Sequence, residues 1–196
     1  MTEKGLLLVL VDPAPALEEE LNAWYDTEHL PERAAIEGVE TARRYTSLGD
    51  GPRYAAIYDL TSLNVLEGEA YLAVSGKNFS PWTKRVTGRT YPVRLSGRQV
   101  GPHQSVTGLC TRLLLVKIGR ASEIDLPVVE TGLKASFAGT TGFLQARIFM
   151  GVEPNPDFII AIAEFSGNHV PALQPEVFGD CGRRIELAAT YRAYRG

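Results

Sequence analysis

The sequence has little of what marks the specialised classes of protein. Its two cysteines, Cys110 and Cys181, are too few and too far apart for a disulfide framework or a zinc site. Its longest apolar run, residues 5–11, is far shorter than the roughly 18–20 residues that a membrane-spanning helix needs. The first residues show no signal-peptide pattern. These absences predict a cytoplasmic, reduced protein without a membrane partner.

The charge distribution also excludes a class of partner. The formal net charge is −3, and no long basic block or phosphate-binding glycine motif occurs. Nucleic-acid binders carry a basic footprint, so we expect no nucleic-acid partner. Hydrophobic residues make up 44% of the 196 residues and charged residues 22%, which is typical of a folded globular protein with one medium domain or two small ones.

A short motif occurs twice. Residues 38–45 and residues 142–149, which lie 104 positions apart, share one pattern. The pattern is a glycine, any three residues, Ala-Arg, any one residue and an aromatic residue. Further matches follow in the same order near this offset, and they are residues 6–9 with 113–116, 54–60 with 159–165, and 90–91 with 190–191. Four ordered matches indicate an internal duplication. We therefore expect two units, residues 1–103 and 104–196, joined by a linker over residues 101–104.

Each half reads as β-α-β-β-α-β. The expected strands are 5–11, 39–47, 53–60 and 89–100, then 108–118, 142–152, 156–165 and 184–194. The expected helices are 16–29, 62–74 and 81–86, then 122–137 and 170–179. Pro31 either interrupts the first helix or opens a second short one over residues 31–37. Such units form four-stranded antiparallel sheets, so the prediction is an α+β protein in which two tandem ferredoxin-like units make an intramolecular α+β barrel.

Residues 24–33, Trp-Tyr-Asp-Thr-Glu-His-Leu-Pro-Glu-Arg, are the most unusual stretch. On a helix, Tyr25 and Asp26 precede His29 by four and three residues, so both can share its face. A carboxylate beside an imidazole raises the imidazole pKa, and such a pair works as a general acid or base. Trp24 and Tyr25 are candidate walls for an apolar substrate. The alternative is that these rings only fill the join between helix and sheet.

The second half lacks this stretch. At the repeat offset, Trp24 corresponds to Val128, Asp26 to Glu130 and His29 to Leu133. We interpret this loss as a sign that one site is kept in the first half, although a diverged repeat that has repacked remains the alternative.

Strand alternation separates two neighbouring arginines. Arg43 and Arg44 face opposite sides of the strand over residues 39–47. Arg43 recurs as Arg147, which favours a scaffold role such as an ion pair across the pseudo-twofold axis. Arg44 has no arginine counterpart, and we predict that it faces a cavity and binds a carboxylate or stabilises an enolate. A solvated or ion-paired arginine is the alternative.

Tyrosines on the next strand are further candidates. Tyr54 and Tyr58 share one strand face and would line the same cavity, with core packing as the alternative. Tyr71 and Trp82 are weaker candidates.

The other ionisable residues suggest no second site. Glu28, His29 and Glu32 are neighbours on the helix but match no strong zinc or iron pattern, so we expect no metal. His103 and His169 are expected to be surface or capping residues, and both cysteines are expected to be packing residues.

The stretch at residues 24–33, with Gly38, residues 42–45, Tyr54, Tyr58 and Tyr71, resembles the EthD-like branch of the dimeric α+β barrel superfamily. The resemblance covers about residues 4–95, whereas the second half resembles the fold without the motif. Ordinary members are single units that dimerise, so this chain looks like a fused pair. The resemblance implies a cavity between sheet and helices and a proton-transferring histidine with a nearby aspartate, which nominates His29 and Asp26.

The resemblance also implies a range of activities. Relatives include cofactor-independent dehydratases, isomerases, cyclases and monooxygenases that act on small aromatic, polyketide or lactone substrates, while others bind haem or have no known activity. We predict a lyase or isomerase without a cofactor, acting on a small, mostly apolar metabolite. The alternatives are a non-catalytic binding protein, a cofactor-independent monooxygenase and an inert filled barrel. The protein is expected to be a monomer or a homodimer.

Overall fold

The computed structural model describes residues 3–49, 51–101 and 105–196. Its strands are β1 (Gly5–Val11), β2 (Val39–Ser47), β3 (Tyr54–Leu60), β4 (Val93–Gly101), β5 (Arg112–Gly119), β6 (Phe143–Gly151), β7 (Phe158–Phe165) and β8 (Ile185–Ala193). Its α-helices are α1 (Glu18–Trp24), α2 (Leu30–Ala34), α3 (Glu69–Ala73), α4 (Pro81–Thr90) and α5 (Leu126–Phe137). A π-helical turn, Tyr25–His29, joins α1 to α2. Short 3-10 helices are Pro15–Leu17, Leu63–Glu67, Gly76–Asn78, Glu123–Asp125 and the longer Pro175–Arg184.

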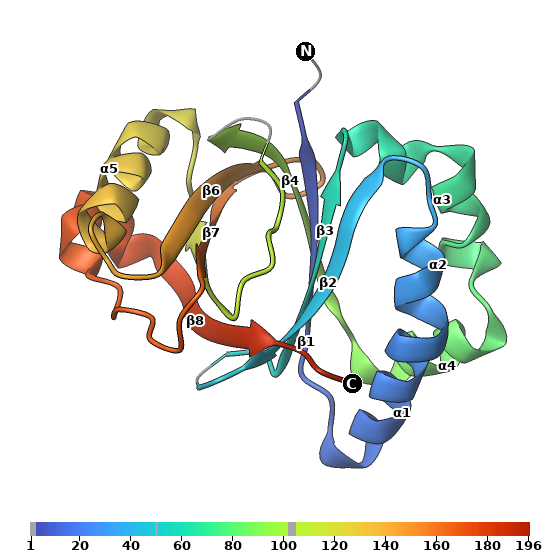
Figure 1. Ribbon diagram of the computed structural model, residues 1–196. Coiled ribbons are helices and arrows are strands. Elements are labelled where there is room, and N and C mark those ends of the chain that lie inside the picture. Colours follow the sequence, from blue (N-terminus) through green and yellow to red (C-terminus); the bar gives the residue numbers. More distant parts are fainter. Residues whose placement is uncertain (1–2, 50, 102–104) are drawn as a thin grey trace.

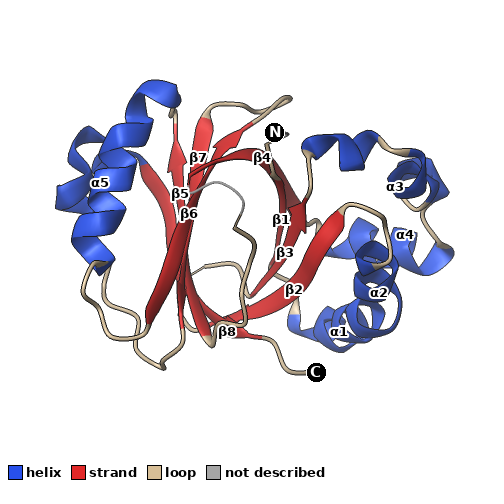
Figure 2. Ribbon diagram, turned by 45° about the horizontal axis from the view of Figure 1, so that its top comes forward, coloured by secondary structure: helices blue, strands red, loops and turns tan. Residues whose placement is uncertain are grey.

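The strands form one closed antiparallel barrel in the order β1-β3-β2-β8-β5-β7-β6-β4. Helices α1 to α4 cover one side of this barrel, and α5 with the Pro175–Arg184 segment covers the other (Figures 1 and 2). The α+β class and the barrel are therefore confirmed. Within each half the strands follow one another in the same spatial order, fourth, first, third, second. The proposed boundary at residues 103 and 104, with His103, lies outside the described residues.

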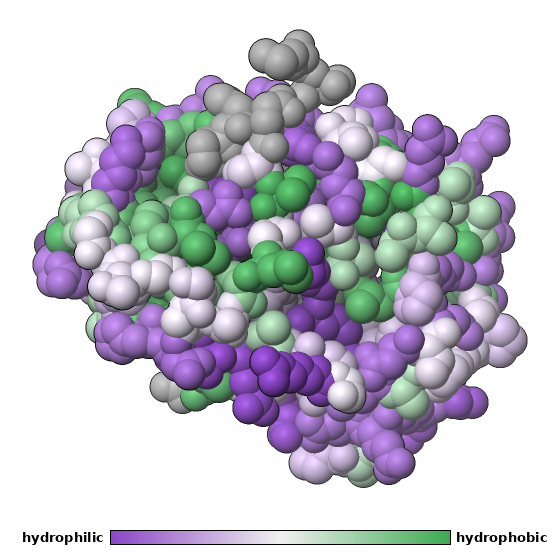
Figure 3. Space-filling view, viewed as in Figure 1, coloured by the Kyte–Doolittle hydropathy of each residue, from purple (hydrophilic) through white to green (hydrophobic). Residues whose placement is uncertain are grey.

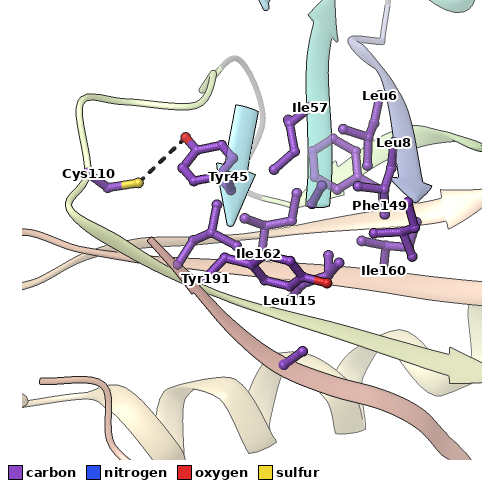
Figure 4. Packing of buried hydrophobic residues seen from close by; sticks show 14 of the residues in the cluster. Leu6, Leu8, Tyr45, Ile57, Cys110, Leu115, Phe149, Ile160, Ile162 and Tyr191 are labelled. Atoms are coloured by element: carbon purple, nitrogen blue, oxygen red, sulfur yellow. Dashed lines mark hydrogen bonds between the residues drawn. The ribbon is translucent and has the colours of Figure 1, made fainter. Parts of the chain in front are cut away.

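Three apolar clusters hold the molecule together. The first fills the barrel interior, where Tyr45, Phe149 and Tyr191 meet aliphatic side chains from both halves (Figure 4). The other two lie between the barrel's outer face and the two helical layers. Because both faces of β3 and β7 are covered, every residue of these strands is buried. Such strands read as near-continuous apolar runs. The apolar runs in the sequence therefore predicted the positions of β3 and β7 well.

The first helix continues through Pro31. The backbone stays right-handed helical from α1 through the π-turn into α2, and Pro31 occupies the first turn of α2. The expected interruption is wrong. A short helix, α2, does hold Pro31 in its first turn, as the alternative expected, but α2 continues from the π-turn and begins at Leu30, before the proline.

Several expected boundaries were also wrong. Residues 89–90 end α4 instead of starting a strand, and β4 begins at Val93. Residues 62–74 divide into a 3-10 turn and α3, and β5 begins at Arg112. Residues 170–174 are not helical, so the exposed His169 does not start a helix. Among the described residues, no helix is long and apolar enough to cross a membrane.

Candidate functional site

A cavity of about 80 Å³ lies between the first-half sheet and its helical layer. Outward-facing side chains of β1 and Tyr58 of β3 form its floor, and the segment from α1 to α2 forms its roof. The lining is mostly apolar, with one histidine and two arginines. The lining residues are Leu7, Val9, Val11, Leu21, Trp24, Tyr25, His29, Arg33, Tyr58, Tyr71, Phe79, Thr87, Thr90, Pro92 and Arg94.

The π-turn sets the position of the histidine. A π-helix bonds i to i+5, so residues five apart come close to one another. The His29 ring accordingly stacks on Trp24, with ring centroids 4.2 Å apart and planes inclined by 25°. Tyr25 meets the same imidazole edge-on at 5.2 Å. Trp24 is anchored by its Nε1–H, which donates to Thr83 Oγ1 over 3.0 Å. The imidazole therefore has a fixed orientation against two aromatic walls.

His29 is neutral in this environment. Burial, followed by the positive charges of Arg33, Arg44 and Arg94, lowers the pKa of His29 to about 3. Its Nδ1 atom is buried and has no hydrogen-bond partner. Leaving a buried polar atom unpaired costs about 1–3 kcal/mol, which a bound ligand can recover. The cavity therefore offers an uncharged imidazole with an unused nitrogen.

Two arginines give the cavity positive charge. Arg33 is buried, hydrogen-bonds to the Val74 carbonyl and to Ser75 Oγ at 3.3 Å, and lies 4.8 Å from the Tyr71 ring centroid. Arg94 is exposed, lies 5.4 Å from the same centroid and has no ion pair among the described residues. Sequence analysis assigned neither arginine a role. The position of Arg33, four residues after His29, was a usable signal, because residues four apart are neighbours on a helix.

Two cavity phenols, those of Tyr25 and Tyr58, stay protonated at neutral pH. Burial raises the pKa of Tyr25 to about 12, although Arg44 and Tyr58 act in the opposite direction. Burial also raises the pKa of Tyr58 well above its ordinary value. The Tyr58 hydroxyl is close enough to affect Tyr25 but makes no hydrogen bond of good geometry. At neutral pH the cavity thus combines a neutral imidazole, the protonated phenols of Tyr25 and Tyr58, and two guanidinium groups.

The expected pairing of Asp26 with His29 is absent among the described contacts. Asp26 is exposed, its Oδ1 lies 3.1 Å from Arg44 Nη1, and its Oδ2 accepts a hydrogen bond from the Tyr194 hydroxyl at 2.9 Å. The expectation assumed α-helical spacing, whereas the π-turn displaces residues three apart from a common face. Asp26 therefore interacts with Arg44 and Tyr194 instead of orienting the imidazole.

Arg44 and Tyr54 also lie outside the cavity. The Arg44 guanidinium is 4.1 Å from the Tyr25 ring centroid and 4.2 Å from that of Tyr194, and it donates to Asn22 Oδ1 over 2.8 Å. Arg44 is therefore the ion-paired arginine that was the alternative to one facing a cavity. The Tyr54 hydroxyl donates to Glu18 over 2.5 Å.

Among the sequence candidates, the cavity thus brings together Trp24, Tyr25, His29 and Tyr58, along with the weaker candidate Tyr71. Trp82 packs against the apolar cluster between the first-half sheet and its helices, but it does not line the cavity.

The surroundings of His29 do not suit a metal or a haem. Glu28 accepts hydrogen bonds from Ser80 and Thr83, and Glu32 points toward Arg33. No group of three or more His, Cys, Asp and Glu side chains could hold a metal ion within the described part of the chain. Pockets for cofactors and drug-sized ligands span about 300–1,000 Å³. A haem therefore does not fit the cavity of about 80 Å³ beside His29.

Comparisons with known proteins identify the fold alone. The sequence matches no family model and no curated protein. One similar structure is an anthrone oxidase-like protein, with 14% identity and a TM-score of 0.67 over 100% of this chain and 92% of that one. Another, from Lactobacillus acidophilus NCFM, is named provisionally as a monooxygenase, with 10% identity and a TM-score of 0.59 over 98% and 94% of the two chains. Chlorite dismutase from Candidatus Nitrospira defluvii matches with 9% identity and a TM-score of 0.56 over 98% and 91%. These neighbours support the dimeric α+β barrel fold.

Proposed function

We propose that the cavity is the active site of a cofactor-independent enzyme in which His29 removes a proton from a small, mostly apolar carbon acid. The observation that carries this proposal is the neutral, desolvated His29 with an unpartnered Nδ1 beside Arg33. A general base must be unprotonated and within reach of the substrate proton, and His29 meets the first condition at any ordinary pH.

The negative charge that forms on the substrate turns a weak base into a usable one. In the free protein, an imidazolium would stand close to Arg33 and Arg94 in an apolar space, so its pKa is low. When a substrate loses its proton, the new enolate or phenolate carries negative charge into the same space. That charge offsets the arginines, raises the pKa of His29 and is itself stabilised. Proton transfer and charge stabilisation therefore reinforce each other.

The size of the cavity restricts the substrate. An apolar cavity of about 150 Å³ holds a benzene molecule, so about 80 Å³ fits an aliphatic fragment or a single ring only after some adjustment of the walls. Arg94 is both exposed and part of the lining, so the cavity reaches the surface there. We expect an enolisable carbonyl compound or a phenol whose polar end points toward Arg94.

The fate of the anion distinguishes two classes of enzyme. Loss of a leaving group or reprotonation elsewhere gives the lyase or isomerase that the sequence suggested. Reaction with molecular oxygen gives a peroxide that loses water, so a CH₂ group and O₂ become C=O and H₂O. The names of the structural neighbours favour oxygenation, and the apolar walls suit O₂. We therefore place oxygenation first and proton transfer without oxygen second.

The fused-pair interpretation belongs to the same proposal. We infer that the chain is an EthD-like tandem of two ferredoxin-like units, supported by the shared strand order of its halves. In the second half, Leu133 is buried among Phe137, Phe165 and Phe178. A groove of about 430 Å³ also lies beside Leu133, but its lining contains no histidine, arginine or tyrosine, which supports a single site of this kind in the first half.

The test follows α-proton exchange in D₂O by NMR for single-ring carbon acids that keep their α-protons at neutral pH, beginning with cyclohexanone, together with oxygen uptake. The wild-type chain should accelerate exchange by about 10²–10⁴-fold, the usual range for a positioned general base. His29→Gln should abolish the acceleration, and the exposed His169→Gln should retain it. Equal exchange rates with wild type and His29→Gln would contradict the proposal, while oxygen uptake separates oxygenation from isomerisation.

A further inference from the structure

A second cleft, separate from the His29 cavity, lies on the outer face of the barrel where the two halves meet at β2 and β8. It has a volume of about 590 Å³ and shares no lining residue with the cavity. Four arginines line it, namely Arg53, Arg112, Arg192 and Arg195, against a single carboxylate, Glu18. The chain as a whole has a net charge of −3. A concentration of positive charge on an acidic protein needs a specific explanation.

The sheet places two of these arginines side by side. Arg112 of β5 is the direct cross-strand partner of Arg192 of β8, and Thr46 of β2 is the partner of Arg192 on its other side. Their sequence neighbours Leu113, Tyr191 and Tyr45 point into the barrel, so alternation puts this row on the outer face. Like charges directly opposite each other destabilise a sheet.

No group in the described part of the chain neutralises this pair. Arg112 donates only to the Thr111 carbonyl, over 2.9 Å, and its Nε is buried without a partner. Neither Arg192 nor Arg195 has an ion pair among the residues that the structure describes. The one carboxylate, Glu18, already bonds to Arg53 at 2.7 Å and to the Tyr54 hydroxyl. At least three guanidinium groups are therefore free to meet an anion.

The walls of the cleft add the rest of a binding site. Thr46, Thr111 and Asn168 offer hydrogen-bonding groups beside the arginines. Tyr194 forms an aromatic wall, fixed by its hydrogen bond to Asp26 and by Arg44 on its ring. The space-filling view shows strongly hydrophilic surface over the end of β8, close to the C-terminus (Figure 3).

We propose that this cleft binds the phosphate group of a small molecule, with Arg112 and Arg192 as its two principal ligands. The planar fork of arginine matches phosphate oxygens in two-point hydrogen bonds, and two forks facing one anion suit a doubly charged group. A dianion between the two strands removes the repulsion that the free cleft carries. The aromatic wall at Tyr194 favours an ester with a ring over free phosphate.

Calorimetric titration at low ionic strength tests this site with inorganic phosphate and with phenyl phosphate. We expect binding by the wild-type chain and a loss of about tenfold or more for Arg112→Gln and for Arg192→Gln, as for removal of one charge-assisted contact. Tighter binding of phenyl phosphate identifies an ester as the ligand, whereas equal affinity identifies free phosphate. Arg98→Gln is the matched control, because it removes the same charge from a residue outside the cleft that pairs with Glu123.

The repulsion between Arg112 and Arg192 also predicts that phosphate reverses the effect of Arg192→Gln on the melting temperature. Without phosphate, Arg192→Gln should raise the melting temperature by about 1–3 °C, because it removes a like-charge cross-strand pair. With phosphate, the order of wild type and variant should reverse. Absence of binding by both probes, or an equal loss in Arg98→Gln, would overturn the proposal. Affinity that grows with the length of a single-stranded oligonucleotide would replace the small molecule with a nucleic acid.

Discussion

At the scale of single residues, His29 makes the folded state sensitive to acid. Its pKa is about 3 in the folded protein, while an unfolded chain has a histidine pKa near 6.5. Between these values the unfolded state binds a proton that the folded state does not, so the free energy of unfolding falls as pH falls. The loss from His29 alone is about 2 kcal/mol between neutral pH and pH 5.

His29→Leu removes this titration, and leucine is what the second half carries at the corresponding position, Leu133. The variant should lose less stability than the wild type between pH 7.5 and pH 5, by about 2 kcal/mol, in urea denaturation. His169→Leu, at an exposed histidine, is the control for losing a histidine as such. Identical slopes for wild type and His29→Leu would show that His29 titrates normally.

The candidate site was partly visible in the sequence at this scale. The rings of Trp24, Tyr25 and His29 stood out by type and spacing, and they do meet in one cavity. Asp26 was assigned to His29 by counting along an α-helix, and that count fails across a π-turn. Arg94 carried no signal at all, because its position at the edge of the cavity comes from long-range strand pairing between β1 and β4.

At the scale of elements, the π-turn is the feature that builds the cavity. It adds one residue to a helical turn, so α1 and α2 present the faces that hold Trp24 and His29 against each other. Such turns are frequent at functional sites and rare elsewhere. Runs of apolar residues predicted the strand positions, but the pattern of apolar and polar residues does not distinguish a π-turn from an α-helix. The fold was therefore predictable where burial sets the pattern, and the site geometry was not.

Inserting one alanine after Thr27 should rotate His29 away from Trp24. Thr27 is exposed, and its hydroxyl donates to the Ala23 carbonyl. The added residue moves His29 from five to six residues after Trp24 and rotates it by about 100°, the angle of one helical residue. His29 then leaves the cavity, and its pKa returns toward 6.5 in an NMR titration. Thr27→Ala keeps the residue count and should keep the pKa low, and a low pKa in a folded insertion variant would refute the role of the turn.

At the scale of the whole molecule, a buried charge network joins the two halves. Arg147 of β6 is fully buried, with Nη1 at 2.5 Å from Asp59 of β3 and Nη2 at 3.3 Å from Glu164 of β7. Thr107, just after the proposed linker, donates its N–H to Asp59 and its Oγ1 accepts from Arg147. Burial raises the pKa of Asp59, but Arg147 and these hydrogen bonds outweigh it and hold the pKa below its usual value. Arg147, the repeat counterpart of Arg43, therefore forms an ion pair between the halves, whereas Arg43 itself donates to the Thr107 carbonyl over 3.3 Å and has no ion pair among the described residues.

Arg147→Met should be among the most destabilising substitutions in the chain. It leaves Asp59 and Glu164 buried without their partner, and breaking a buried pair in this way costs about 3–5 kcal/mol. Arg98→Met, which removes a partly exposed pair with Glu123, should cost no more than about 1 kcal/mol. Replacing Asp59 by Asn and Glu164 by Gln together with Arg147→Met should recover part of the loss, because uncharged buried groups need no counter-ion. A triple variant no more stable than Arg147→Met in urea denaturation would mean that packing, and not charge, makes Arg147 important to the barrel.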